Sequence, residues 1–209
     1  AVGYHQTAIG NYGSKWEEAV SSNFGLDASL LNDKLTVVFD VWQRKTNDLL
    51  YPAPLAGPIA GFKTIPFRNI AAMQNNGIDS GLGYKGPISN DLKFNVDLNL
   101  SHYKNKITQV NEGATFFYPS SQQGRIDNRL ATEININQVG FPISSFRGYT
   151  VDGIFNSQAE LDALDMNGKT IGGLRFKDLN GDKKINDADL GIIGSPHPDL
   201  VAGLNLGVD

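Results

Sequence analysis

Leu92 to Leu100 reads LKFNVDLNL, and apolar and polar side chains alternate along its whole length. One face carries Leu92, Phe94, Val96, Leu98 and Leu100, and the other carries Lys93, Asn95, Asp97 and Asn99. Successive side chains of a strand point to opposite faces, so the pattern predicts a strand with one apolar and one polar face. About 9–11 residues is also the length at which a tilted strand crosses a bilayer.

The same alternation recurs in four other segments. It predicts five strands, at about 17–30, 34–48, 76–86, 92–107 and 199–209. Asp27, Asp40, Asp79 and Asp97 fall on the polar faces in mid-strand, where Asp is generally disfavoured. Their repetition favours a wet, polar lumen, although a soluble sandwich would also turn polar residues outward.

The connections between these strands differ greatly in length. LNDK (31–34) and GPISND (86–91) make short turns, whereas the connections at about 51–70 and 108–198 are long. Short turns at one end and long loops at the other are typical of outer-membrane barrels, whose long loops are extracellular. In the second long loop, Ser157 and Glu160 stand at capping-box spacing and predict a short helix to about Leu164.

The second long loop also contains DLNGDKKINDAD, Asp178 to Asp189, which has the spacing of a calcium loop. Positions 1, 3, 5, 7, 9 and 12 are Asp178, Asn180, Asp182, the Lys184 carbonyl, Asn186 and Asp189. Calcium takes six to eight oxygen ligands, and such a loop supplies them in order. Lys183 stands where Gly is usual, and Asp189 stands where Glu is usual. A loop that ends in Asp resembles the calcium loops of dockerin-type modules. The loop therefore predicts a structural Ca²⁺ site, and the alternative is an Asx-rich turn held by its own side-chain-to-backbone hydrogen bonds.

Composition narrows the class of protein. The 209 residues carry a net charge of −4, so no basic footprint indicates a nucleic-acid partner. The absence of cysteine excludes disulfides and thiolate chemistry. The chain has no run of 18 apolar residues, and it begins without Met or a signal peptide. We expect it to be a segment of a longer chain or a processed product.

Aromatic residues of the long loop are the candidate substrate contacts, because aromatic faces stack on sugars and peptides. They are Phe116, Phe117, Tyr118, Phe146 and Tyr149, with Phe155 beside them in the sequence. The alternative is that they pack beneath the loop or against another subunit. The histidines and serines have no metal, triad or nucleophile-elbow spacing, so we expect no catalytic residues and no enzyme activity.

Four blocks of the sequence resemble, in the same order along the chain, segments of one known protein family. LLNDKLTVVFDVWQRKTNDLLYP (30–52) resembles the family's hairpin, and NIAAMQNNGIDSGLGYK (69–85) resembles its "N-G--EN-G-E--L-Y" strand. FPISSFRGYTVDGIF (141–155) resembles a loop of the family. GLRFKDLNGDKKINDADLGIIGSPHPDLVAGLNLG (173–207) resembles its "DLNGDG-ID--D---IG-P-P---YG-N" signature. The chain thus resembles the SusC/RagA-type TonB-dependent transporters over roughly residues 15 to 209.

The resemblance implies an all-β fold, a fragment of about five antiparallel strands of a large transmembrane β-barrel with long extracellular loops and one short helix. It implies import of glycans or oligopeptides through the outer membrane of a Gram-negative bacterium. The implied partners are a SusD-like surface lipoprotein acting as a lid, the TonB complex acting through a plug region that this sequence lacks, outer-membrane lipid, and the remainder of the same barrel. Such barrels have 22 strands and a plugged lumen.

A second interpretation is a secreted, calcium-stabilised β-sandwich binding module. The direction of the apolar faces distinguishes the two, since a barrel segment points Phe94 at lipid and a sandwich buries it. A calcium-dependent docking module would need a second copy of the loop followed by a helix, and the sequence has neither.

Overall fold

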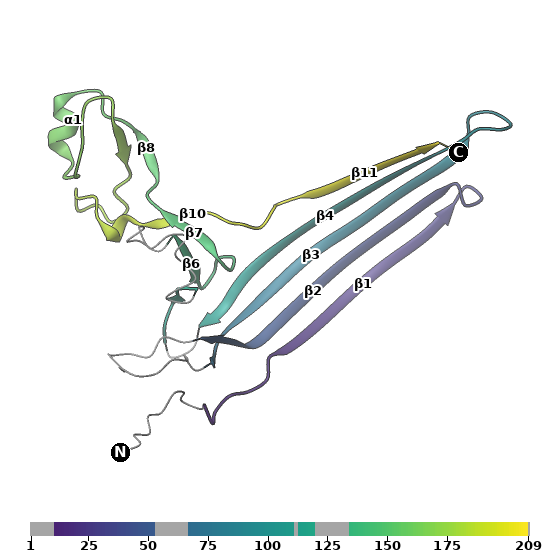
Figure 1. Cartoon of the computed structure of the whole chain (residues 1–209), viewed down its shortest axis with the longest axis horizontal. Helices are drawn as coiled ribbons and strands as arrows, with labels where there is room; N and C mark the ends of the chain where they lie inside the picture. Colours follow the sequence, from purple (N-terminus) through teal and green to yellow (C-terminus); the bar gives the residue numbers. More distant parts are fainter. Residues whose placement is uncertain (1–10, 53–66, 111–112, 120–133, 209) are drawn as a thin grey trace, which may run out of the picture.

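The computed structural model describes residues 11–52, 67–110, 113–119 and 134–208. Its largest element is a five-stranded antiparallel sheet in the order β1-β2-β3-β4-β11 (Figure 1). The strands are β1 (Glu18–Leu30), β2 (Leu35–Pro52), β3 (Phe67–Pro87), β4 (Lys93–Val110) and β11 (Val201–Val208). The sheet is open, and its outer strands are β1 and β11. The expected fold class, all-β with antiparallel strands and one short helix, is confirmed.

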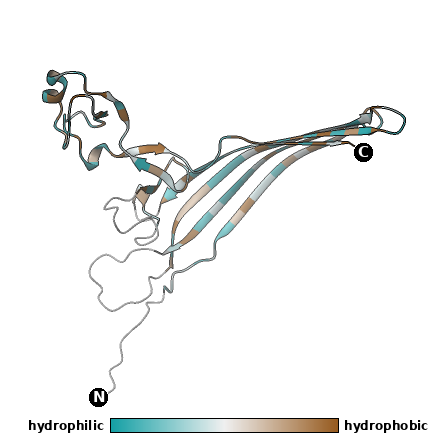
Figure 2. Cartoon of the chain, turned by 45° about the horizontal axis from the view of Figure 1, so that its top comes forward, coloured by the Kyte–Doolittle hydropathy of each residue, from teal (hydrophilic) through white to brown (hydrophobic). Residues whose placement is uncertain are grey.

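The pairing register places the apolar residues of all five strands on one face. Leu26 pairs with Phe39, Val37 with Leu82, and Leu82 with Leu98, which in turn pairs with Leu204. The apolar face therefore forms a continuous band, about four alternate residues deep on each strand. At about 3.3 Å per residue, four alternate residues span about 20 Å along a strand, which is of the same order as the ~25 Å apolar belt of membrane barrels. Figure 2 shows the alternation of hydropathy along the strands.

The loop layer packs on the polar face and leaves the apolar band free. Asn105 and Ile107 of β4 point to the same side as Asp97 and are buried at the loop end. Asn105 accepts a hydrogen bond from the backbone N–H of Ile143 (2.7 Å), and Ile107 exchanges two backbone hydrogen bonds with the 140–141 turn. In the described part of the chain no second sheet covers the band, which argues against the sandwich interpretation. The loops and the polar residues of the strands therefore share one face of the sheet, which we call the interior face because the sequence predicts that it lines a barrel.

Two tight turns close the other end of the sheet. Residues Leu31, Asn32 and Asp33 all have φ near +60° in the β1–β2 turn. Asn and Asp tolerate this left-handed conformation better than most residues. The β3–β4 turn closes with a hydrogen bond from Ile88 N–H to the Leu92 carbonyl (2.8 Å). The short turns and long loops therefore lie at opposite ends, as the sequence predicted.

Two strands are longer than the alternation indicated. The structure extends β2 to Pro52 and begins β3 at Phe67, so the expected loop at 51–70 is shorter, and residues 53–66 lie outside the described ranges. The extra pairing contains register shifts near Thr46–Leu50. These parts of the strands extend past the apolar band, and loops cover one of their faces. Apolar and polar residues therefore need not alternate along them.

The long loop between β4 and β11 folds into small elements rather than remaining irregular. A four-stranded sheet contains β5 (Phe116–Phe117), β6 (Asn135–Gln138), β7 (Ser145–Gly148) and β10 (Gly191–Gly194). A hairpin pairs β8 (Val151–Ile154) with β9 (Leu174–Phe176), and η1 (Asp187–Asp189) is a 3₁₀ turn. The predicted helix is present as α1 (Gln158–Ala163), with the Ser157 hydroxyl accepting from Glu160 N–H. Among the described residues, no helix is both long and apolar enough to cross a membrane.

Candidate functional site

Three strands bring polar and aromatic side chains together on the interior face of the sheet. Trp42 of β2 donates its indole N–H to Asp79 Oδ2 of β3 (2.7 Å). Ser101 of β4 donates its hydroxyl to Asp79 Oδ1. The rings of Trp42 and Tyr103 stack with centroids 6.4 Å apart. We call Trp42, Asp79, Ser101 and Tyr103 the wall cluster.

A glycine makes the position of Trp42 possible. Gly77 lies between Trp42 and Tyr103 in the cross-strand register, and a Cβ at this residue would stand 2.4 Å from the Trp42 ring. The indole can therefore lie flat across β3 toward Asp79. Tyr103 continues the chain of contacts, since its hydroxyl hydrogen-bonds His197 Nδ1 in the loop layer (3.1 Å). The wall cluster is thus linked to the loop before β11.

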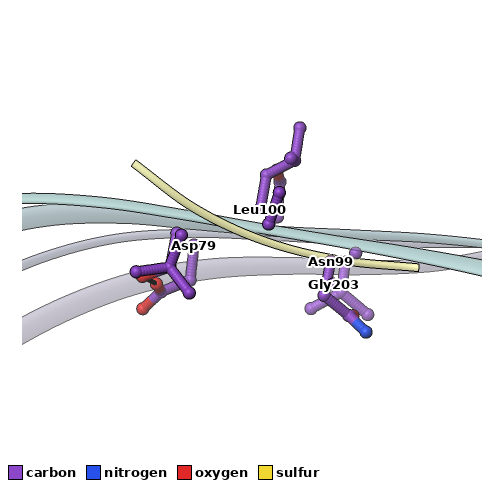
Figure 3. A pocket seen from close by; sticks show the side chains of 10 residues that line it. Asp79, Asn99, Leu100 and Gly203 are labelled. Carbon is purple, nitrogen blue, oxygen red and sulfur yellow. Dashed lines mark hydrogen bonds between the residues drawn. The ribbon is translucent and has the colours of Figure 1, made fainter. Parts of the chain in front are cut away.

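A polar hollow of about 470 Å³ adjoins the wall cluster toward β1. Its interior-facing lining is Ser21, Asn23, Asp40, Trp42, Arg44 and Asp79. Asn23 donates its side-chain amide to Asp40 Oδ1 (3.0 Å). Figure 3 shows Asp79 and Asn99 on one side of the sheet and Leu100 on the other. Carboxylates, amides and an aromatic ring on one wall can hydrogen-bond and stack on a hydroxyl-rich or amide-rich solute.

The predicted loop aromatics are described residues, but they do not form one site. Phe116 and Tyr118 meet edge to face (5.4 Å), and Phe117 packs against Tyr51 of β2 (5.1 Å). Tyr149 stacks instead on Phe176 (5.2 Å). Phe116 and Phe146 are exposed, whereas Phe155 is fully buried and serves as a core residue of the loop layer.

Arg147 joins part of this aromatic group. Its guanidinium donates to the Tyr118 hydroxyl (3.1 Å) and lies 5.9 Å from the Tyr118 ring centroid. Burial raises the pKa of Tyr149, and the nearby negative charges of Asp187 and Asp189 add to the effect. The Tyr149 hydroxyl is therefore neutral and able to donate a hydrogen bond at physiological pH.

The calcium-type loop is held by hydrogen bonds among its own residues. Asp178 accepts from the N–H groups of Gly181 and Lys183, both at 2.7 Å. Lys183 adopts φ +63°, so it supplies the left-handed turn for which Gly is usual. Asp189 is fully buried and accepts from Leu179 N–H (2.9 Å) and Asn186 N–H (3.0 Å).

Other side-chain oxygens of this loop also accept hydrogen bonds from within the loop. The side chains of Asn180, Asp182 and Asn186 each accept from a backbone N–H two residues further on (2.8–2.9 Å). The ligand chemistry suits calcium, but across the described ranges no three acidic or histidine side chains converge as a metal site. In this conformation the loop therefore stabilises itself without gathering a full ligand set.

Replacing Asp189 with Ala is expected to open the calcium-type loop. Backbone hydrogen bonds, first from Asn186, hold the pKa of Asp189 below its ordinary value of 3.8. The stabilisation is therefore complete above pH 3.8 and is lost as pH falls through the lowered pKa. We expect limited proteolysis of the full-length protein to cut within 178–189 in Asp189→Ala but not in Asp187→Ala, whose side chain is exposed. Equal resistance of both variants to protease would contradict this role for Asp189.

Relatives with curated names match nearly the whole chain. TonB-dependent receptor P3 of Formosa agariphila is 31% identical over 201 residues, which is 95% of this chain and 20% of the relative. TonB-dependent receptor SusC of Bacteroides thetaiotaomicron is 28% identical over 93% of this chain and 18% of the relative. The chain belongs to the SusC/RagA-type TonB-dependent transporters, as a segment of the barrel. It spans about a fifth of the length of these relatives.

Comparison with solved structures gives the same fold. The RagAB peptide transporter superposes with a TM-score of 0.66 at 23% identity, covering 93% of this chain and 19% of that one. No protein-family model matches the sequence. The expected location, the outer membrane of a Gram-negative bacterium, is confirmed by the named relatives. The apolar band of the SusC-type segment is therefore its lipid-facing surface.

Sequence reasoning missed most of the wall cluster. The alternation does place Trp42 on the polar face, which argues against an interfacial girdle role for it. It does not reveal that Asp79 accepts hydrogen bonds from both the Trp42 indole and the Ser101 hydroxyl, because that requires the register of three strands. The signal that could have found the site is Gly77, a small residue opposite a large one across an otherwise continuous strand.

Proposed function

We propose that this segment is part of the lumen wall of an outer-membrane TonB-dependent importer of large polar nutrients, either glycans or oligopeptides. The observation that carries the proposal is the sheet itself. One face is an apolar band that suits lipid, and the opposite face carries the wall cluster beneath an ordered loop layer. A closed barrel built from such strands would surround a polar path across the membrane.

Import through this wall requires partners outside the segment. The unpaired strands β1 and β11 would pair with the remainder of the same barrel, because open sheet edges do not persist in a bilayer. A SusD-like lipoprotein would cover the loop end, and the TonB complex would act through the plug region. The names of the relatives support TonB dependence, and the resemblance to SusC supports the lid.

Two groups of residues are proposed as substrate contacts. The wall cluster would bind within the lumen through Asp79 and the Trp42 ring. The loop residues Phe116, Phe117, Tyr118, Phe146 and Tyr149 would make the first contacts at the extracellular mouth. The exposure of Phe116 and Phe146 and the Arg147–Tyr118 pair support this role, since exposed aromatic and guanidinium groups recognise sugars and peptides.

Growth on defined nutrients tests the function. A strain deleted for the full-length transporter would be complemented with wild type, Trp42→Ala or Trp16→Ala and supplied with one oligosaccharide or oligopeptide at a time. Loss of the stacking surface is expected to lower the apparent affinity for the imported nutrient about tenfold in Trp42→Ala. Trp16, which is 92% exposed before β1, is the matched control. A deletion strain that grows normally on every such nutrient would refute the proposal.

We also propose that Ca²⁺ stiffens the loop formed by Asp178, Asn180, Asp182, Lys184, Asn186 and Asp189. The support is the oxygen-rich ligand spacing, and binding would require the Asp182 carboxylate to turn toward Asp178 and Asp189. Calcium is expected to slow proteolysis within 178–189 of the full-length protein, and a chelator to reverse this. Asp182→Asn should weaken the calcium effect while leaving the metal-free cleavage rate unchanged. Identical cleavage with calcium and with chelator would exclude the ion.

A further inference from the structure

The lipid-facing surface changes character abruptly toward the loop end. The last row that contains apolar side chains has Val41 of β2 and Ile78 of β3, with the polar His102 beside them on β4. The next row outward is Gln43, Asn76 and Lys104, and the one after it is Lys45, Gln74 and Lys106. These side chains continue the parity of the apolar band, so they point out of the barrel and not into the lumen. We call Lys45, Lys104 and Lys106 the outer lysines.

A hollow of about 700 Å³ lies at this boundary. Its lining includes apolar side chains of the band (Phe24, Val41, Ile78) and polar side chains from the row above (Gln43, Asn76, Lys104). One half can therefore receive the start of an acyl chain while the other half faces a polar headgroup. Such a mixed lining suits an amphiphile seated at the membrane surface.

The amide side chains among the lysines are fixed in place. Asn76 Oδ1 accepts from Gln43 Nε2 (2.9 Å) and from Gln74 Nε2 (3.0 Å). The outer lysines surround this group and are exposed. Among the ion pairs of the described residues, none includes an outer lysine. Glu18 of β1 is an acidic side chain with the same outward parity. It lies two residues further toward the loop end than Val20, which pairs with Lys45.

We propose that the outer lysines and the hollow beneath them bind the phosphate group of an outer-leaflet lipid. Lys45 and Lys106 lie two strand spacings apart, about 9.6 Å, and Lys104 and Lys106 lie about 6.8 Å apart along β4. Lysine side chains are long enough for the three ammonium groups to converge on one phosphate across these distances. The long loops mark this end as extracellular, which selects the outer leaflet. The proposal rests on the orientation of the sheet in the membrane and is independent of the imported nutrient.

Lipid binding to the purified, delipidated full-length transporter tests the proposal. Native mass spectrometry would follow titration with monophosphoryl lipid A, with the same lipid lacking its phosphate, and with excess inorganic phosphate. The triple variant Lys45→Gln/Lys104→Gln/Lys106→Gln is expected to bind monophosphoryl lipid A on the order of 100-fold more weakly, at about fivefold per lysine. Inorganic phosphate alone is expected neither to bind nor to compete.

The matched control is Lys34→Gln/Lys85→Gln/Lys93→Gln, which removes the same charge at the turn end of the sheet. It should bind the lipid as wild type does, and an unchanged heat-induced mobility shift would show that both triple variants fold. Equal affinity of the outer-lysine variant and wild type would overturn the proposal. The proposal would also be overturned if both triple variants lost affinity for the lipid equally. It would be overturned as well if wild type bound the dephosphorylated lipid as tightly as monophosphoryl lipid A. A changed oligomeric mass with lipid binding intact would assign these lysines to a contact between copies instead.

Discussion

Arginine in place of Leu98 is expected to remove most of the assembled transporter from the outer membrane. Leu98 lies at the centre of the apolar band, between Leu82 of β3 and Leu204 of β11. A guanidinium at this depth faces hydrocarbon and has no polar partner across the strand. Arginine near the bilayer midplane of a barrel costs about 2–4 kcal/mol, which is a large part of the usual margin of stability.

Asn99→Arg is the matched control for Leu98→Arg. Asn99 is the next residue of the same strand, and it points to the lumen between Gly81 and Gly203. There the guanidinium would meet water and the carboxylates of the polar face. Heat-modifiable protein in outer-membrane fractions and urea midpoints in lipid vesicles would measure both variants. Normal assembly of Leu98→Arg, or a greater loss in Asn99→Arg, would reverse the assigned faces.

The alternation at Leu92–Leu100 predicted both faces of the sheet correctly because a bilayer imposes a strict requirement on one of them. Beyond the band, toward the loops, no bilayer requires an apolar face. The sequence Phe67–Gln74 accordingly does not alternate between apolar and polar residues, although it forms part of β3. Water satisfies the outward side there and the loops cover the inward side. Strand length beyond the membrane therefore depends on pairing between strands, which a single strand's sequence does not encode.

The site was less predictable than the fold for a related reason. Alternation assigns Trp42 and Asp79 to the polar side, but residues 37 positions apart meet through strand register. The register is set by turn geometry at 31–34 and by contacts over the whole sheet. The outer lysines were unpredictable for the same reason. Each lysine points to the same face as the apolar band, but only the register of the strands brings the three side chains together on one surface.

Gly77→Ala is expected to disrupt the wall cluster far more than the same change at Gly81. The added Cβ at Gly77 would stand 2.4 Å from ring atoms of Trp42, which the stack with Tyr103 and the bond to Asp79 hold in place. At Gly81 the nearest atom is Asn99 Oδ1 at 3.3 Å, the end of a side chain that can turn away. Both glycines lie on β3 and face the lumen, so they experience the same strand environment.

Overpacking of this kind costs about 1–3 kcal/mol, so the urea midpoint of Gly77→Ala should fall while that of Gly81→Ala stays near wild type. The indole must also leave Asp79, and nutrient affinity should therefore fall in Gly77→Ala about as far as in Trp42→Ala. The double variant Gly77→Ala/Trp42→Ala separates the two effects, because removing the ring removes the clash. Its urea midpoint should recover relative to Gly77→Ala, whereas its nutrient affinity should not. A double variant no more stable than Gly77→Ala would mean that Gly77 serves the strand backbone and not the placement of Trp42.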